Sequence, residues 1–314
     1  MIDLDKIRKS EIKIICVGSY PVIIQSILDF DYLSSKKTPS VFAIIANGRK
    51  FERYFWGKKE ILIPVYSSLE TVPDSIKDKI TFFLNLTSAR RVLSSTQSLL
   101  ETLPSLLGGV IFAENVPEKH SLQLVNLSRK TNKFLIGPAS VGLAIPRILK
   151  LGAIGGIDVN QLIDLSLFTK GSIAVFSASG GMTGELIRIV SKANRNISFS
   201  LSFGGDRFPI VTPKDAFIAS QNDSQTKAIC YFGELGGIDE YEIASLLKTK
   251  KVTKPTLCFI AGSISEIFET PPQFGHAKAM AKSKKESAKE KKKALRQAGA
   301  IVSDTRGSLR IFKN

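Results

Sequence analysis

The chain has 314 residues, of which 43% are hydrophobic, so it can bury a sizeable core and is expected to form two domains. Its formal net charge of +16 favours polyanionic partners such as nucleotides, polycarboxylates or nucleic acid. No apolar run is long enough to span a membrane, and the charged start MIDLDKIRKSEIK excludes a signal peptide, so we expect a cytoplasmic protein without membrane contact. The three cysteines lie in apolar runs without metal-ligand spacing, which predicts buried thiols and no metal site.

The first half of the chain alternates between apolar, strand-like runs and helical patterns. We expect strands at residues 11–18, 41–46, 60–65, 81–86, 109–113 and 133–137, with a helix at residues 22–30. This alternation predicts a doubly wound parallel sheet, a Rossmann-like first domain. The first turn, GSYP, lacks the G-x-G-x-x-G pattern, so an ordinary dinucleotide site is not expected there.

The second half of the chain repeats this alternation with different turns. Residues 137–171 are rich in glycine and proline, and we interpret them as the crossing between two domains. Strands are then expected at residues 172–177, 197–203, 228–232, 256–261 and 300–303. The pattern predicts a second parallel α/β sheet.

The loops after four strands of this second series carry side chains suited to phosphoryl transfer. Residues 179–181 open a helix whose free amides and dipole favour an anion. The next loop contains Arg207, the third begins at Glu234, and the fourth contains His276, whose imidazole can act as a nucleophile near neutral pH. Because carboxyl ends of parallel strands share one sheet edge, we expect these groups to converge there.

The stretch at residues 278–296 is densely basic and is interrupted only by Glu286 and Glu290. We interpret it as the solvated face of a helix. The alternative is a nucleic-acid-binding surface, but the stretch contains no aromatic residues between its lysines, so nucleic acid is not an expected partner.

The segments SGGMTGEL, FGGDRFP, GELGG and FGHAKA, in this order and spacing, resemble the alpha-subunit module of succinyl-CoA ligases and ATP citrate lyases. The resemblance is closer to ATP citrate lyases and citryl-CoA synthetases, and it extends into the first half through ILDFDYLSS, YFWGKKEILIPV, FAENVPE and FLIGPASVG. It implies a Rossmann-like CoA-binding domain over residues 1–137. A flavodoxin-like parallel-sheet ligase domain would follow over residues 138–314, with a histidine that is phosphorylated during turnover.

The resemblance also implies roles for individual residues. His276 matches the phosphorylated histidine, and Glu234 matches the glutamate that orients its imidazole. The phosphate-binding helix start corresponds to Ser179, Gly180 and Gly181. The CoA-binding positions are Gly18, Ser19, Tyr20, Pro21, Val22, Ile23, Lys50, Phe112, Ala113 and Glu114. The substrate-binding positions are Gly184, Gly204, Gly205 and Arg207.

Three positions depart from the family pattern. Ala178 stands where the family commonly has arginine, and Lys278 stands where it has glycine after His-Ala. Lys278 either restores the missing charge or faces solvent. Succinyl-CoA ligases have tyrosine at the position of Gly184, and the loss of that bulk fits a substrate larger than succinate.

The resemblance implies a subunit of an ATP-dependent citrate–CoA ligase, an acid–thiol ligase that forms citryl-CoA through a phosphohistidine and an acyl phosphate. The chain has no G-x-x-x-x-G-K-[ST] loop, and the resemblance implies that ATP and Mg²⁺ are bound mainly by an ATP-grasp large (beta-type) subunit, with citrate or another carboxylate as substrate. Because the chain ends at Asn314, we expect a separate lyase to cleave the citryl-CoA. The alternatives are a succinyl-CoA ligase alpha subunit and a catalytically impaired CoA-binding paralogue.

Overall fold

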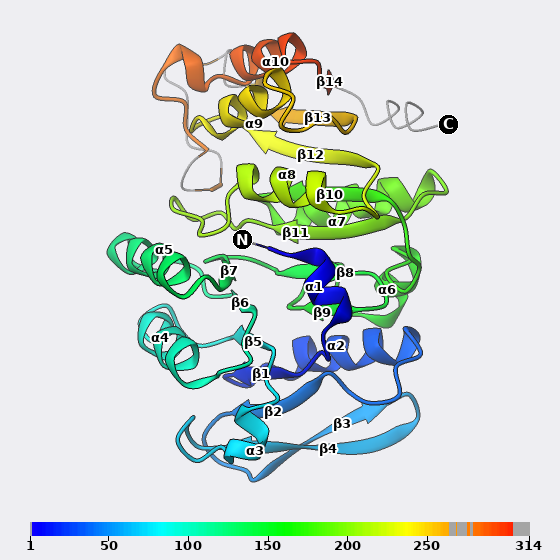
Figure 1. The fold of residues 1–314 in the computed structure, drawn as a ribbon, viewed down its shortest axis with the longest axis vertical. Helices are drawn as coiled ribbons and strands as arrows, with labels where there is room; N and C mark the ends of the chain where they lie inside the picture. The colour runs from blue at the N-terminus through cyan, green and yellow to red at the C-terminus, as the bar shows by residue number, and fades with distance from the viewer. Residues whose placement is uncertain (1, 264–267, 269–274, 277–278, 304–314) are drawn as a thin grey trace.

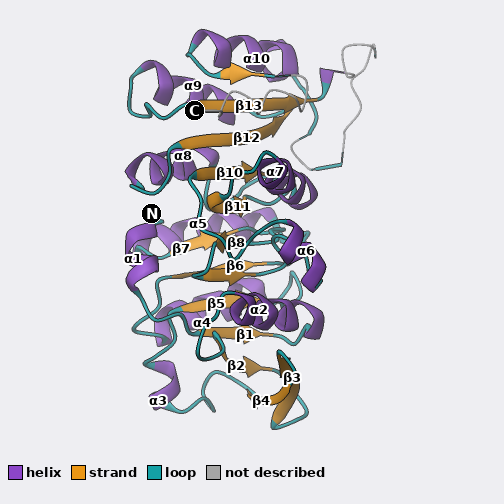
Figure 2. Cartoon of the chain, turned by 90° about the vertical axis from the view of Figure 1, so that its right-hand side faces the viewer, coloured by secondary structure: helices purple, strands orange, loops and turns teal. Residues whose placement is uncertain are grey.

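The computed structural model describes residues 2–263, 268, 275–276 and 279–303. Its strands form two seven-stranded sheets that follow one another along the long axis of the molecule (Figures 1 and 2). The first sheet contains β1 (Ile14–Val17), β2 (Val41–Ile45), β3 (Phe51–Trp56), β4 (Lys59–Tyr66), β5 (Phe82–Asn85), β6 (Gly108–Ile111) and β7 (Phe134–Ile136). The second contains β8 (Leu143–Ile145), β9 (Leu149–Leu151), β10 (Ile173–Ser177), β11 (Ile197–Ser202), β12 (Ala228–Glu234), β13 (Thr256–Ala261) and β14 (Ile301–Val302).

The first sheet has the strand order β3-β4-β2-β1-β5-β6-β7. All its strands except β3 pair in parallel, and they coincide with the strands predicted from the sequence. Counted along the chain, the parallel strands stand in the order 3-2-1-4-5-6, which is that of the Rossmann fold and confirms the predicted fold class. The helices of this half are α2 (Pro21–Leu33), α3 (Asp74–Lys77), α4 (Val92–Thr102) and α5 (Glu118–Thr131).

The edge strand β3 was not predicted. It pairs antiparallel with β4, and the two are joined by a two-residue turn at Gly57 and Lys58. Gly57 has φ +59°, which suits the first central position of a tight hairpin turn. Most of the side chains of β3 are exposed or half-buried, so the strand lacks the continuous apolar run that marks its neighbours.

The second sheet has the strand order β14-β13-β12-β10-β11-β8-β9. The five strands from β10 to β14 pair in parallel and stand in the flavodoxin-like order 2-1-3-4-5, as predicted. Figure 2 shows α7 on the opposite face of this sheet from α8 and α9. The helices of this half are α6 (Val159–Asp164), α7 (Gly180–Lys192), α8 (Pro213–Asn222), α9 (Asp239–Lys248), the 3₁₀ helix η2 (Lys284–Glu286) and α10 (Ala288–Gln297).

Residues 137–171 form regular secondary structure, whereas the sequence suggested a simple crossing between two domains. They contain the hairpin β8–β9 and helix α6, and β8 pairs antiparallel with β11, so the hairpin extends the second sheet. Both strands are fully buried but only three residues long, which is too short to give a recognisable strand pattern.

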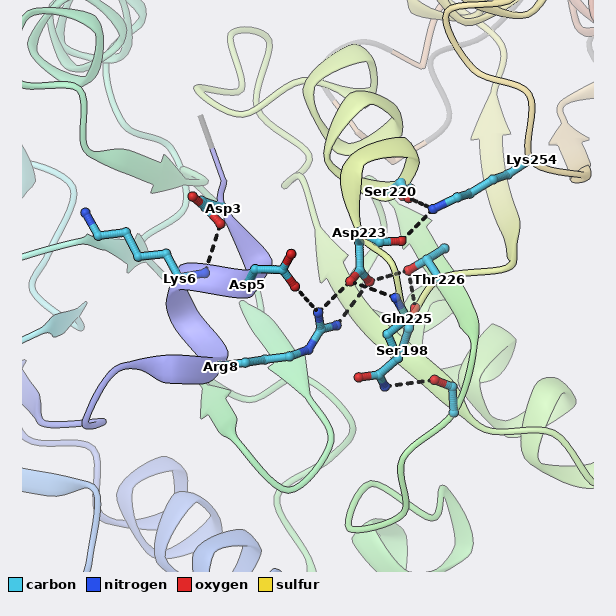
Figure 3. Close-up of polar contacts among 11 residues, drawn as sticks. Asp3, Asp5, Lys6, Arg8, Ser198, Ser220, Asp223, Gln225, Thr226 and Lys254 are labelled. Carbon is cyan, nitrogen blue, oxygen red and sulfur yellow. Dashed lines mark hydrogen bonds and ion pairs between the residues drawn. The ribbon is translucent and has the colours of Figure 1, made fainter.

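The two sheets share one hydrophobic core and are also joined by polar contacts. Helix α1 (Leu4–Lys9) begins at Asp3, whose carboxylate accepts a hydrogen bond from the amide of Lys6 at 2.9 Å. From this helix, the guanidinium of Arg8 reaches the buried carboxylate of Asp223 just beyond α8, with N–O distances of 2.5 and 3.0 Å (Figure 3). The amino-terminal helix therefore links the two halves of the chain (Figure 1).

The three cysteines are free and buried, as predicted from the sequence. Burial raises the pKa of Cys16 and of Cys230 to about 12, so both thiols remain protonated near neutral pH. In the part of the chain that the structure describes, no helix is long and apolar enough to cross a membrane. Over those same residues, no group of three or more His, Cys, Asp or Glu side chains is arranged to hold a metal ion.

Candidate active site

The carboxyl edge of the second sheet gathers most of the predicted ligase residues. Strands β10 and β12 are neighbours, with Ser177 opposite Phe232, although β11 lies between them in the sequence. The strand order therefore reverses between them, and a crevice forms at such a switch point in open α/β sheets. Glu234 is the last residue of β12, and Ser179 follows the end of β10 by two residues.

The structure brings His276 and Glu234 into direct contact. The imidazole Nδ1 lies 2.8 Å from Glu234 Oε1, and the two side chains are 29% and 23% exposed. A carboxylate on Nδ1 favours the tautomer with the proton on Nδ1, which leaves the lone pair of the neutral ring on Nε2. The pair can therefore act as an oriented nucleophile.

The pKa of His276 is raised above its ordinary value. The main cause is the hydrogen bond with Glu234, which stabilises the imidazolium more than partial burial destabilises it. The negative charges of Glu234 and Glu114 act in the same direction. Glu114 comes from the loop after β6, so a residue of the first half of the chain contributes to the field at the imidazole.

The loop after β11 leaves room for this imidazole because it contains two glycines. A Cβ on Gly205 would lie 2.5 Å from Cδ2 and 3.1 Å from Nε2 of His276, so any side chain there would displace the ring. Gly204 has φ +97°, and a Cβ at that position would lie 1.9 Å from the carbonyl oxygen of Pro138. Of these two glycines, both predicted as substrate-binding, Gly205 leaves the space for the histidine ring and Gly204 allows the loop to approach the backbone of Pro138.

The two residues after these glycines face the first half of the chain. The guanidinium of Arg207 lies 3.3 Å from the carboxylate of Glu118 at the start of α5. Asp206 was missed by the sequence analysis, although it lies within GGDRFP. Its Oδ2 is buried and has no hydrogen-bond partner within the described ranges, and burial, with the charge of Glu114, raises its pKa.

The predicted phosphate-binding residues form the amino-terminal turn of α7. Ser179 is the N-cap, and its Oγ accepts a hydrogen bond from the amide of Met182 at 3.3 Å. Gly180 packs against Val141, whereas a Cβ on Gly181 or Gly184 would meet no atom within 4 Å. These three glycines line a cavity of about 380 Å³ together with Val141, Ala153, Gly155, Gly156, Gln161, Asp164, Leu165, Glu185 and Arg188.

The predicted CoA-binding residues surround the end of β1, but they do not all face one space. Gly18, with φ +90°, approaches the carbonyl of Leu86, since a Cβ there would lie 3.1 Å from its oxygen. The exposed ring of Tyr20 lies 6.3 Å from that of Phe112. Ile23 belongs to the hydrophobic core, so its side chain is not available to a ligand.

The other predicted CoA-binding residues have varied surroundings. The hydroxyl of Ser19 donates a hydrogen bond to Glu52, while Pro21 is the first residue of α2 and Val22 is exposed. The amide of Phe112 donates to Asn85, and the carbonyl of Ala113 accepts from Ala139. The exposed Lys50 accepts a backbone hydrogen bond from Val65 and Glu114 is exposed.

A cavity of about 490 Å³ opens at the carboxyl edge of the first sheet, where the strand order reverses between β1 and β5. Of the predicted residues, Gly18 lines it. Polar residues that the sequence analysis passed over complete the wall, and they are Asn47, Ser67, Ser68, Glu70, Thr87, Arg91, Ser94, Ser95 and Ser98. These residues could have been found from the sequence, because Arg91 and the serines after it lie at the start of a helix that follows a buried strand.

The interpretation of residues 278–296 as a solvated helix face is wrong for Lys291. This lysine is 1% exposed and lies on the same face of α10 as the buried Ala288 and Leu295. The helical spacing of these three residues was the signal that the sequence analysis missed. Ala178 accepts a hydrogen bond from Ser202, whereas Lys278 lies outside the described residues.

Comparison with known proteins finds a family and several proteins that this chain resembles. Residues 176–301 match the family model described as CoA-ligase. The chain is 36% identical over 292 residues to a probable ATP-citrate synthase subunit 1 of Neurospora crassa, which covers 92% of this chain and 43% of that protein. It superposes with a TM-score of 0.91 and 33% identity on the ATP citrate lyase of Methanosaeta concilii in complex with (3S)-citryl-CoA, covering 96% of this chain and 50% of that one.

A second structure, of ATP citrate lyase from Methanothrix soehngenii in complex with citrate and coenzyme A, gives the same TM-score of 0.91 with 33% identity over 96% of this chain and 50% of that one. The chain therefore spans about half or less of the length of these three proteins. The similarity extends through both sheets.

Proposed function

We propose that the chain, whose residues 176–301 match the CoA-ligase family model, is a subunit of an ATP-dependent citrate–CoA ligase that forms citryl-CoA. The observation that carries this proposal is the 2.8 Å contact between His276 and Glu234 at the carboxyl edge of the second sheet. The relatives named as ATP-citrate synthase and the citryl-CoA complex of a similar structure support citrate as the acid.

In the first step, the Nε2 lone pair of His276 attacks the γ-phosphorus of ATP. The bond from phosphorus to the bridging oxygen breaks, and ADP leaves with its electron pair. The Nδ1 proton stays in the hydrogen bond with Glu234, whose negative charge stabilises the positive charge that develops on the ring. Glu234 therefore both orients the ring and lowers the barrier to phosphorylation.

In the second step, a carboxylate oxygen of citrate attacks the phosphorus, and the N–P bond breaks to give citryl phosphate and neutral His276.

In the third step, the thiol of CoA loses its proton to solvent, and the thiolate attacks the carbonyl carbon of this mixed anhydride. Inorganic phosphate then leaves with the electrons of the C–O bond. The free amides at the start of α7 supply positive potential for the phosphate on the protein side.

We assign CoA to the first sheet, within residues 1–137, and the ligase chemistry to residues 138–314. The 490 Å³ cavity beside Gly18 lies at the switch point of the first sheet, where open α/β sheets bind their ligands. Arg91 and the hydroxyl groups in its wall suit the phosphates of a nucleotide-like ligand. We place the pantetheine arm along Tyr20 and Phe112, whose ring centroids are 6.3 Å apart, and Glu114, whose charge acts on His276.

We further propose that ATP and Mg²⁺ are bound mainly by an ATP-grasp large subunit. The Neurospora relative is named as subunit 1, and that protein and the Methanosaeta enzyme are about twice the length of this chain or more, which supports an assembly with further parts. The His276 loop must then face that partner during the first step.

A mass measurement of the CoA thioester tests the proposed function. The chain is mixed with its ATP-grasp partner, ATP, CoA and either citrate or succinate. We expect citryl-CoA from the wild type, none from His276→Ala, and unchanged yield from His120→Ala, which replaces the other histidine. Succinyl-CoA as the preferred product would identify a succinyl-CoA ligase instead, and no thioester from either acid would reject the ligase assignment.

A further inference from the structure

Helix α10 carries a fully buried lysine in the most basic stretch of the chain. Lys291 is 1% exposed, while Lys289 and Lys293 on the same helix are exposed. A lysine is rarely buried unless its ammonium group is paired, because leaving water costs the charge its hydration. The surroundings of Lys291 therefore indicate what this charge does.

The ammonium group of Lys291 is held by three acceptors. Its Nζ donates to the backbone carbonyl of Glu234 at 2.7 Å and to that of Gly236 at 2.5 Å, and it lies 2.6 Å from Oε2 of Glu240. The two carbonyl groups accept hydrogen bonds from the ammonium, and the contact with Glu240 is an ion pair. Two of these acceptors are the carbonyl groups of Glu234, which contacts His276, and of Gly236, two residues further along the chain.

The carboxylate of Glu240 connects this ammonium back to β12. Glu240 is 3% exposed at the start of α9, and its Oε1 accepts a hydrogen bond from the buried hydroxyl of Tyr231 at 2.9 Å. Gly233 leaves room for this carboxylate, because a Cβ there would lie 2.4 Å from Oε1. The network thus starts and ends on β12, on either side of Gly233.

We propose that Lys291 is a positioning residue that fixes the end of β12 and so aims the carboxylate of Glu234 at Nδ1 of His276. The Glu234 side chain is partly exposed, so its direction depends on the backbone from which it extends. The single ammonium group of Lys291 binds the carbonyl groups of Glu234 and Gly236 and so holds that backbone in place. The role in phosphorylation rests on the proposed function, whereas the aiming of Glu234 does not.

The alternative is a buried ion pair that contributes to folding alone. The two differ in their effect on the imidazole, because the hydrogen bond from Glu234 is the main reason that the pKa of His276 is raised. If the end of β12 is released, this hydrogen bond weakens and the pKa falls toward the ordinary value of 6.5. A purely structural role would lower the free energy of unfolding and leave the pKa of the folded protein unchanged.

The test uses Lys291→Met and the double variant Lys291→Met/Glu240→Gln, which avoids leaving a buried carboxylate without its partner. Two controls lie on the same helix. Lys293→Met removes an exposed lysine, and Leu295→Ala weakens the packing of α10 without removing a hydrogen bond to β12. The pKa of His276 is measured by NMR titration in each folded variant.

We expect the Lys291 variants to lower the pKa of His276. We also expect phosphorylation of His276 to slow by about tenfold to a hundredfold, the range known for groups that orient metal-binding side chains. Lys293→Met is expected to match the wild type in both measurements. Leu295→Ala is expected to lower the free energy of unfolding but not the pKa of His276.

An unchanged pKa in a folded Lys291 variant would overturn the proposal, as would an equal fall in Leu295→Ala. If neither Lys291 variant folds, the lysine is required for folding and the positioning role is rejected. If the wild type itself is not phosphorylated, the proposed function fails, but the titration still decides whether Lys291 aims Glu234.

Discussion

The chemistry proposed for this protein depends on three residues at or beyond the ends of three separate strands. His276 supplies the nucleophile, Glu234 holds its Nδ1 at 2.8 Å, and Gly205 leaves the space that the ring occupies. The residue types of this site could be predicted from the sequence, because histidine, carboxylate and glycine each follow a predicted strand. The contact of Gly205 with the ring could not be predicted, because it depends on where the loop after β11 folds over the edge of the sheet.

The variant Gly205→Ala tests the space beside the imidazole. Its Cβ would lie 2.5 Å from Cδ2 of His276, so the ring must move, and a displacement of about 1 Å can slow a reaction by roughly a hundredfold. We expect phosphorylation of His276 to fall to this extent while circular dichroism and the midpoint of unfolding stay near those of the wild type. A phosphorylation rate equal to that of the wild type would show that the ring does not lie against this glycine.

The pH dependence of stability tests the contact between His276 and Glu234. Because the pKa of His276 is raised in the folded state, the contact stabilises the fold fully below the ordinary value of 6.5 and loses this contribution as the pH rises through the folded value. Urea unfolding of the wild type and Glu234→Gln should therefore differ most at about pH 5 to 6.5 and converge at higher pH. A difference that grows with pH would contradict the contact.

At the scale of elements, the parallel strands were predictable because each is a short, continuous apolar run that ends in a polar or glycine-rich turn. The antiparallel additions were not predicted. Strand β3 is largely exposed, and β8 and β9 are three residues each. Helix α10 was predicted as a basic helix, but the burial of Lys291 required the helical period to be applied to a lysine, a residue type that is seldom buried.

The start of helix α7 gives a matched pair of glycine variants. A Cβ at Gly180 would lie 2.5 Å from Cγ1 of Val141, whereas one at Gly181 would meet no atom within 4 Å. Gly180→Ala should therefore lower the free energy of unfolding by about 1 to 3 kcal/mol through overpacking. Gly181→Ala should raise it by about 0.5 to 1 kcal/mol, because alanine loses less backbone entropy in a helix. Chemical denaturation of both variants measures this, and equal effects would place Val141 elsewhere.

At the scale of the whole molecule, the candidate site depends on both halves of the chain. The loop after β11 meets the loop and helix after β6 through Arg207 and Glu118, and Glu114 of that same loop contributes to the raised pKa of His276. Helix α1 adds a second link, between Arg8 and Asp223 (Figure 3). The relative position of the two sheets therefore matters to the chemistry.

The link through α1 can be tested with two variants. One removes Arg8, and the other removes only the exposed carboxylate of Asp5 that also contacts it. Arg8→Leu leaves the fully buried side chain of Asp223 without its cation, and the free energy of unfolding should fall by about 3 to 5 kcal/mol. Asp5→Ala removes a half-exposed carboxylate 3.4 Å from the same guanidinium and should cost at most about 1 kcal/mol. Urea denaturation distinguishes the two, and a small effect of Arg8→Leu would mean that α1 is not a structural link.

The proposed mechanism requires that His276 carries a phosphoryl group during turnover, which a labelling experiment can detect. The chain and its ATP-grasp partner are incubated with γ-labelled ATP, and the label on this chain is assayed for the acid lability and base stability of a phosphohistidine. We predict that the label appears on the wild type and on His120→Ala, is reduced in Glu234→Gln, and is absent from His276→Ala. A label that persists in His276→Ala would contradict the account.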